Sequence, residues 1–267
     1  MKKKKILLTA SVILLAAAAV FTGKYLLSER GLTNDEPANP SLSSYIVTET
    51  DDKADKYKNQ SETETSDSSE TESTEEYVSP IDFDKLKKDN ADTCAWLEIP
   101  ESDFSFPVMQ HPTDNSYYLT HDFERNYSIY GAAYIEDYNK NDFSDMAAVI
   151  YGHNINNGEW FGQLQTIFTD PERFEECRNI KLYLPNEERT YKVFAAVPYD
   201  DSHILYYNDF SNDKVYDDFI EEIADTRALN SIIDKSALPS SGTRLLILST
   251  CLKGDYSHRF LVLAAEC

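Results

Sequence analysis

Short apolar runs recur along the chain from about residue 80 onward, separated by clusters of proline, glycine, asparagine and aspartate. Their length and their content of β-branched and aromatic residues predict β-strands. The eight predicted strands are residues 95–99, 106–109, 132–135, 147–151, 180–184, 190–197, 245–249 and 260–264. Eight short strands at this spacing predict a mainly β domain that forms a closed or nearly closed barrel.

Helical periodicity interrupts the predicted strands in a few places. Apolar residues recur at helical spacing over residues 212–224, which predicts an amphipathic helix before the strand at 245–249. A short helix is predicted at 82–90, ahead of the first strand, and a further helical turn at 171–177.

The N-terminal part of the chain has a different pattern. Lysines at positions 2–5 precede eighteen uncharged, mainly apolar residues at 6–23. This length suits a membrane span, and the lysines before it predict a cytoplasmic N-terminus. A cleavable signal peptide, with the alanines at 16–19 near its cleavage site, is the alternative. Both interpretations predict that the remainder of the chain is exported.

The predicted span leads into a polar stretch. Residues 28–79 have almost no regular apolar pattern, and residues 61–76 consist only of serine, threonine, aspartate and glutamate. Such a segment buries too little apolar area to offset its ordering entropy, so it is predicted to be a disordered acidic tether. The net charge of -22 argues against nucleic-acid binding. Residues 80–267 are long enough for a single core.

Three reactive side chains stand at the ends of predicted strands. Cys251 follows one apolar run and Arg259 opens the next, so antiparallel pairing of the two runs places a thiol beside a guanidinium. His153 stands just past another strand. Catalytic groups often project from strand ends, and a nearby cation lowers the pKa of a thiol. This arrangement predicts a nucleophilic cysteine.

Several motifs accompany these residues. They are Trp-Leu-Glu-Ile-Pro at 96–100, Phe-Pro-Val-Met-Gln at 106–110, Tyr-Tyr-Leu-Thr-His-Asp-Phe at 117–123, Tyr-Gly-His-Asn at 151–154 with Phe-Gly-Gln-Leu at 161–164, and Leu-Ser-Thr-Cys at 248–251. With these motifs in this order, the chain resembles the sortases, which are cysteine transpeptidases of Gram-positive cell surfaces. Within that family it resembles class B. Ile247 stands where the family signature has threonine, a mild departure because both residues are β-branched. The resemblance extends from about residue 82 to the C-terminus.

The resemblance implies a fold and a reaction. The fold is a sortase-like, eight-stranded closed or nearly closed β-barrel with an N-terminal helix and a helix inserted before the cysteine strand. Cys251 would attack the peptide bond after threonine in a C-terminal sorting signal and form a thioacyl intermediate. His153 would protonate the leaving amine, and Arg259 would hold the oxyanion or substrate carbonyls.

The resemblance also implies partners and a location. The expected substrates are surface proteins with a sorting signal of the Asn-Pro-x-Thr type, and the acceptor is a peptidoglycan amine or a pilin lysine. Sortases are usually anchored by one span, which favours residues 1–27 as a basic stub and signal-anchor. The expected location is the cell membrane, single-pass, with a cytoplasmic N-terminus, a tether at 28–79 and an extracellular catalytic domain at 80–267.

Secondary candidates surround the cysteine. Ser249 and Thr250 are predicted to line the substrate groove, and Asp255 is a candidate for orienting His153. His258 competes with His153 because it adjoins Arg259, but the Tyr-Gly-His-Asn motif favours His153.

The other cysteines are predicted to be structural. They are Cys94, Cys177 and Cys267. A disulfide between Cys94 and Cys177 is possible outside the cell. No metal-binding spacing pattern occurs in the sequence, so neither a metal nor another cofactor is expected.

Two alternatives to a sortase remain at this stage. One is a different cell-wall cysteine peptidase or hydrolase, although the chain lacks the residue order of the papain-like enzymes and the motif of the L,D-transpeptidases. The other is a non-catalytic, membrane-tethered β-barrel that binds a ligand.

Overall fold

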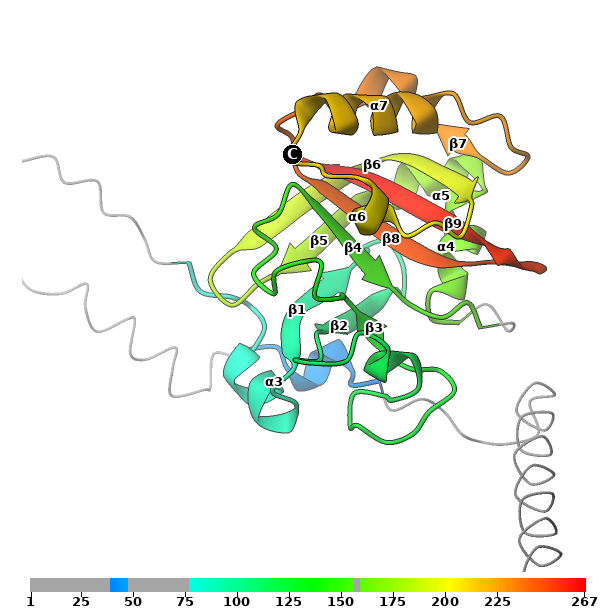
Figure 1. The fold of residues 1–267 in the computed structure, drawn as a ribbon. Coiled ribbons are helices and arrows are strands. Elements are labelled where there is room, and N and C mark those ends of the chain that lie inside the picture. The colour runs from blue at the N-terminus through cyan, green and yellow to red at the C-terminus, as the bar shows by residue number, and fades with distance from the viewer. Residues whose placement is uncertain (1–38, 48–76, 156–158) are drawn as a thin grey trace, which may run out of the picture. The chain divides into compact units, whose positions relative to one another are not determined.

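The strands form one sheet that closes on itself, as Figure 1 shows for the computed structural model, which describes residues 39–47, 77–155 and 159–267. Within these ranges the strands are β1 (Thr93–Glu98), β2 (Ser105–Met109), β3 (Ala133–Tyr134), β4 (Ala147–Tyr151), β5 (Asn179–Tyr183), β6 (Glu188–Tyr199), β7 (Ile232–Ile233), β8 (Leu245–Leu252) and β9 (Asp255–Glu266). Eight of them follow the order β5-β1-β2-β3-β4-β8-β9-β6, and the pairing of β5 with β6 closes the ring. β7 adds to the edge of β6. The predicted mainly β, eight-stranded closed barrel is confirmed.

Successive side chains along a strand point to opposite faces of the sheet, which divides the core into an inner and an outer layer. Leu246 and Leu248 of β8 belong to the cluster inside the barrel, whereas Leu245 and Ile247 belong to a second cluster on the outer face. Each of these side chains is at most 1% exposed. Burial of such a side chain stabilises the fold by about 1.5–3 kcal/mol, and a one-residue slip of β8 would exchange the side chains of the two layers.

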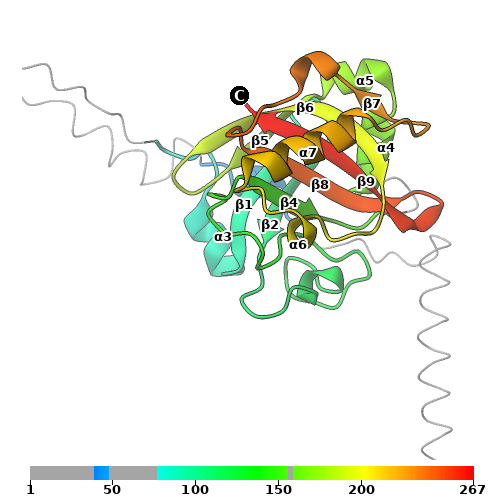
Figure 2. The same ribbon diagram turned by 45° about the horizontal axis from the view of Figure 1, so that its top comes forward.

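Helix α7 (Asp213–Ala224) covers the outer cluster, as Figure 2 shows. Its buried residues include Phe219 and Ile223, which pack over β6, β8 and β9. Asn212 caps the helix by accepting hydrogen bonds from the amides of residues 214 and 215. The predicted helix before the cysteine strand is therefore confirmed.

The predicted N-terminal helix is α3 (Phe83–Asp89), and the predicted helical turn is α5 (Pro171–Glu176). The sequence pattern missed α4 (Gly162–Phe168) and α6 (Ile204–Tyr207), which are too short for a clear period. The remaining short turns are 3-10 helices η1 (Leu42–Ser44), η2 (Tyr117–Leu119) and η3 (Lys235–Ala237). β9 also begins earlier than predicted, because the exposed residues at its start carry no apolar pattern.

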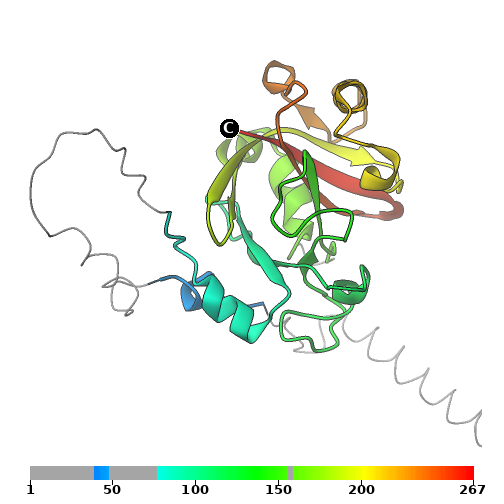
Figure 3. The ribbon, with the colours of Figure 1, turned by 60° about the vertical axis from the view of Figure 1, so that its left-hand side comes forward.

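Residues 39–47 pack against the domain, although they lie within the predicted tether (Figure 3). Tyr45 is 6% exposed, and its ring lies 6.1 Å from that of Trp96 and 6.2 Å from that of Phe123. Its hydroxyl donates a 2.7 Å hydrogen bond to Asp89 of α3. This segment therefore corrects the predicted tether, of which residues 28–38 and 48–76 lie outside the described residues. A single aromatic residue in a polar stretch gives no periodic signal.

The predicted location also needs correction. Among the residues that the structure describes, no helix is long and apolar enough to cross a bilayer. This finding corrects the predicted single-pass membrane location and the predicted contact with the membrane. The predicted span at 6–23, with the rest of residues 1–27, lies outside the described residues.

Tyr45 provides a test of the docked segment. We expect Tyr45→Ala to lower the free energy of unfolding by about 3 kcal/mol, because a buried aromatic ring is removed from the contact with Trp96 and Phe123. Tyr45→Phe removes only the bond to Asp89 and is expected to cost about 1 kcal/mol. Urea denaturation measures both values. Tyr207→Ala is the control, since Tyr207 is 69% exposed; equal effects of Tyr45→Ala and Tyr207→Ala would contradict the docking.

Candidate active site

Cys251 and Arg259 face each other across the hairpin of β8 and β9. They are direct partners in the antiparallel register, and Arg259 Nη1 lies 3.8 Å from Cys251 Sγ. Arg259 Nη1 also donates to the carbonyl of Tyr256 at 3.3 Å. Both residues are partly exposed. The predicted juxtaposition of a thiol and a guanidinium is therefore present.

His153 stands at the same edge of the barrel. β4 and β8 are parallel, with Tyr151 opposite Ser249, so His153 and Cys251 each lie two residues beyond a paired position. The Gly152 amide extends the pairing with a 3.2 Å hydrogen bond to the Ser249 carbonyl. This register brings the backbone positions of His153 and Cys251 to the same level.

The orientation of the His153 imidazole follows from its hydrogen bond. Nε2 lies 2.8 Å from the carbonyl oxygen of Leu119 and donates to it, since a carbonyl only accepts. In the neutral imidazole, Nδ1 then carries the free lone pair. The Leu119 carbonyl thereby selects the neutral tautomer in which Nδ1 carries no hydrogen.

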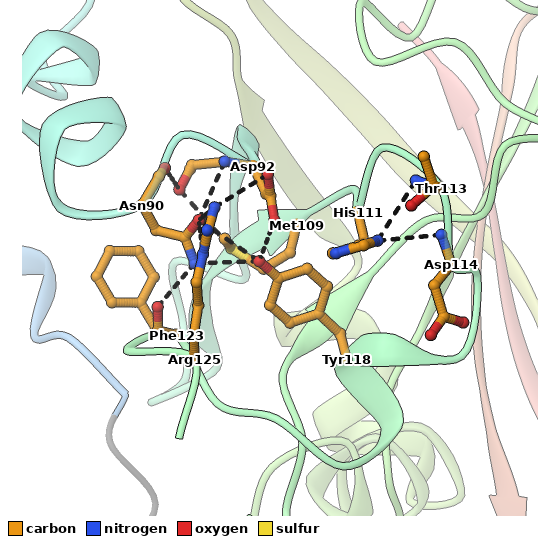
Figure 4. Close-up of polar contacts among 10 residues, drawn as sticks. Asn90, Asp92, Met109, His111, Thr113, Asp114, Tyr118, Phe123 and Arg125 are labelled. Atoms are coloured by element: carbon orange, nitrogen blue, oxygen red, sulfur yellow. Dashed lines mark hydrogen bonds and ion pairs between the residues drawn. The ribbon is translucent and has the colours of Figure 1, made fainter. Parts of the chain in front are cut away.

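The segment that presents Leu119 is fixed by a partly buried polar network (Figure 4). Tyr118 donates a 2.7 Å hydrogen bond to Asp92 and accepts one of 3.1 Å from Asn90. Arg125 forms an ion pair with Asp92 at 3.1 Å and donates to the Asn90 side-chain oxygen at 3.0 Å. Burial raises the pKa of Tyr118, and the bond to Asp92 raises it further, so the hydroxyl stays protonated and donating. The network holds η2, and with it Leu119, against the barrel.

Two tyrosines border the candidate site, and the sequence patterns did not single them out. The rings of Tyr134 and Tyr151 stack with centroids 5.5 Å apart. Burial raises the pKa of Tyr134, and the charge of Arg259 partly counters this effect, which indicates that the guanidinium lies nearby. The Tyr151 hydroxyl is buried and has no hydrogen-bond partner within the described residues. The position of Tyr151 directly before Gly152 and His153 is the one sequence signal that could have identified it.

Ser249 and Thr250 do not line an open groove. They are 4% and 2% exposed, respectively, because the barrel and its outer layer cover this part of β8. This burial corrects their prediction as substrate-binding residues. Ser249 contributes through its carbonyl, which accepts the bond from Gly152.

Asp255 pairs with His258 rather than with His153. One carboxylate oxygen lies 2.8 Å from His258 Nδ1, and the other accepts hydrogen bonds from the Ser257 side chain and amide. These bonds, chiefly those from Ser257, lower the pKa of Asp255. The prediction that Asp255 orients His153 is therefore corrected: the local turn at the start of β9 binds the carboxylate first.

All four cysteines, each within the described ranges, are free thiols, which corrects the possible disulfide between Cys94 and Cys177. Both belong to the inner core. Burial raises the pKa of Cys94 to about 12 and also raises the pKa of Cys177. Cys267 is exposed. Within the described part of the chain, no group of three or more histidine, cysteine, aspartate or glutamate side chains is arranged to hold a metal ion.

Comparison with known proteins identifies the class of this fold and site. The family model for the sortase domain matches residues 97–267, and the chain belongs to the sortase family of cysteine transpeptidases. Its similarities lie within class B, so the chain is a class B sortase. The two alternatives, another cell-wall cysteine hydrolase and a non-catalytic binding barrel, are not favoured.

The similar proteins support this assignment at low sequence identity. Sortase B of Listeria monocytogenes is 25% identical over 184 residues, which cover 68% of this chain and 72% of the relative. The X-ray structure of Clostridium perfringens sortase B is 26% identical, with a TM-score of 0.61, and the match covers 69% of this chain and 98% of that one. The Staphylococcus aureus sortase B-substrate complex is 25% identical, with a TM-score of 0.62, and the match covers 72% and 86% of the two chains.

Thiol reactivity tests the electrostatics of the site. At neutral pH we expect iodoacetamide to modify Cys251 first, because its sulfur lies 3.8 Å from the Arg259 guanidinium, and exposed Cys267 more slowly. Cys94 and Cys177 should stay unmodified until the protein is unfolded, because burial keeps both thiols protonated and covered. Peptide mapping by mass spectrometry gives the four rates. Equal rates at Cys251 and Cys267 would show that Arg259 does not activate the thiol.

Tyr118 provides a test of the network beneath Leu119. Tyr118→Phe removes the hydroxyl that joins Asn90 to Asp92, and we expect it to lower the free energy of unfolding by about 1–2 kcal/mol. Hydrogen exchange of the Ala132 amide, which donates to the Tyr118 carbonyl, should become faster. The control is Tyr207→Phe, where the ring is 69% exposed. Unchanged exchange at Ala132 in Tyr118→Phe would exclude this role of the network.

Proposed function

We propose that Cys251 is the nucleophile, His153 the general acid and base, and Arg259 the group that binds the oxyanion. One observation carries the proposal: the register of β4 and β8 puts His153 level with Cys251, while Arg259 lies 3.8 Å from the sulfur. Nucleophile, proton carrier and fixed cation are the parts that acyl transfer through a thioester requires.

In the proposed first stage, the Cys251 thiolate attacks the carbonyl carbon of the peptide bond after threonine in the sorting signal. The negative charge that develops on the carbonyl oxygen is stabilised by the Arg259 guanidinium. The tetrahedral intermediate collapses, the C–N bond breaks, and protonated His153 gives the Nδ1 proton to the leaving amine. The N-terminal part of the substrate remains attached to Cys251 as a thioester.

In the second stage, an acceptor amine attacks the thioester carbonyl. Nδ1 of the now neutral His153 takes the proton that the amine loses, the new C–N bond forms, and the C–S bond breaks. The Cys251 thiolate and the protonated imidazole are both regenerated. The bond between Nε2 and the Leu119 carbonyl is compatible with both stages, because only Nδ1 exchanges a proton.

The proposed substrates are proteins that carry a C-terminal sorting signal. Support comes from the similarity to the Staphylococcus aureus sortase B-substrate complex. An Asn-Pro-x-Thr type of signal follows from the class B resemblance, and the proposed acceptor is a peptidoglycan amine or a pilin lysine. The proposed catalytic domain comprises residues 80–267, with the docked segment 39–47 against it. Residues 39–47 are therefore excluded from the proposed tether at 28–79.

Intact-mass analysis of the protein incubated with Asn-Pro-x-Thr-Gly and Leu-Pro-x-Thr-Gly peptides tests the proposal. We expect an acyl adduct on Cys251 that an added amine discharges, with a preference for the first peptide. Cys251→Ala should reduce turnover by more than about a thousandfold, because no covalent intermediate can form.

Cys267→Ala is the matched control, since it removes an exposed thiol and should leave turnover unchanged. Peptide cleavage that persists in Cys251→Ala would refute Cys251 as the nucleophile. A higher rate with the Leu-Pro-x-Thr-Gly peptide would refute only the proposed substrate preference.

A further inference from the structure

Two side-chain amides converge on the backbone carbonyl of Cys251. Asn154 Nδ2 donates to this oxygen at 2.8 Å, and Gln165 Nε2 donates to it at 3.1 Å. The other end of the Gln165 amide accepts a 2.9 Å hydrogen bond from the backbone N–H of Lys253. Gln165 therefore brackets the backbone from Cys251 to Lys253, and we refer to Asn154 and Gln165 as the carbonyl clamp.

The clamp acts where the strand ladder is interrupted. Cys251 pairs with Arg259, but the next residue, Leu252, pairs with Asp255, so the register shifts between Cys251 and Leu252. A bulge of this kind disrupts the hydrogen bonds that hold a strand in place. The Cys251 carbonyl lies on the β4 side of β8, as does the Ser249 carbonyl that accepts from Gly152. The β4 pairing ends at Tyr151, so side-chain donors supply the Cys251 carbonyl.

The clamp also connects Cys251 to the strand that carries His153. Tyr151 pairs with Ser249, the Gly152 amide donates to the Ser249 carbonyl at 3.2 Å, and Asn154 donates to the Cys251 carbonyl. The two strand ends are thus linked up to the residue that bears the thiol. Because Asn154 directly follows His153, the same bond links the backbone next to His153 to the backbone of Cys251.

Two glycines permit the close approach of α4 that brings Gln165 to this carbonyl. A Cβ atom on Gly152 would lie 2.3 Å from the Phe161 ring, and a Cβ atom on Gly162 would lie 2.8 Å from the Asn154 side-chain oxygen. Both distances are shorter than a van der Waals contact allows. The glycines of the two motifs that contain them therefore have a steric role in building the clamp.

We propose that Asn154 and Gln165 are positioning residues for the transpeptidation: they hold the Cys251 backbone so that its thiol stays beside Arg259 and level with His153. This inference rests on the proposed role of Cys251. The clamp acts through the backbone of Cys251 and leaves substrate binding to other groups. Its loss therefore lowers kcat and leaves KM nearly constant.

Isosteric variants test the clamp in the full-length protein. Asn154→Leu and Gln165→Met remove the donors with little change in volume, and each is expected to lower kcat about 10- to 100-fold, with KM within about threefold, because small displacements of reacting groups are costly. Gln163→Met is the matched control on the same helix and should keep the wild-type kcat. Wild-type kcat in both clamp variants, or losses confined to KM, would overturn the proposal.

The Gln165→Glu variant separates positioning from simple destabilisation. Its carboxylate still accepts from the Lys253 amide, but it meets the Cys251 carbonyl with a second acceptor oxygen. Protonation at lower pH restores one O–H donor. We therefore expect the ratio of the Gln165→Glu rate to the wild-type rate to rise several-fold between pH 8 and pH 5. A ratio that is constant across this range would overturn the role of the donor even if the other variants fold poorly.

Cys251→Ala, measured in parallel, distinguishes failure of the clamp from failure of the proposed function. Loss of turnover in Cys251→Ala together with wild-type kcat in the clamp variants overturns the clamp alone. Persistent turnover in Cys251→Ala overturns both proposals. Loss of turnover in Cys251→Ala, a lower kcat in the clamp variants and recovery of Gln165→Glu at low pH support both.

Discussion

The candidate site depends on the parallel pairing of β4 with β8. Five consecutive residue pairs, from Ala147 with Leu245 to Tyr151 with Ser249, set one strand end level with the other. A shift by one residue would exchange the β8 side chains between the inner and outer layers of the core, so the close packing of both layers enforces the register. The positions of His153 and Cys251 are a consequence of that packing.

The sequence predicts the parts of this site that local structure determines. Cys251 and Arg259 are eight residues apart on adjoining strands, so hairpin pairing alone brings them together. His153 was identified by its motif, because nothing local to it reveals β8 as its neighbour. The barrel can likewise be predicted from the sequence, since its short apolar strands carry a clear pattern, whereas the short helices do not.

Other features of the site arise from contacts between distant segments, which sequence patterns do not record. The contact of His153 with Leu119 and that of Gln165 with Cys251 span 34 and 86 residues. At Asp255 the sequence instead predicts a long-range contact with His153, but Ser257 and His258 satisfy the carboxylate locally. Aspartate readily forms such short-range turns, and these compete with any distant partner.

Several polar contacts that arrange the site share one chemical feature, which explains why some of its residues are easier to identify than others. The acceptors are the backbone carbonyls of Leu119, Ser249 and Cys251. Any amino acid supplies such a carbonyl, so these contacts do not restrict the side chains at the accepting positions. The donating side chains of His153 and Asn154 cannot be replaced so freely. The constraint therefore falls on the donors, and the motif Tyr-Gly-His-Asn at 151–154 contains two of them in succession.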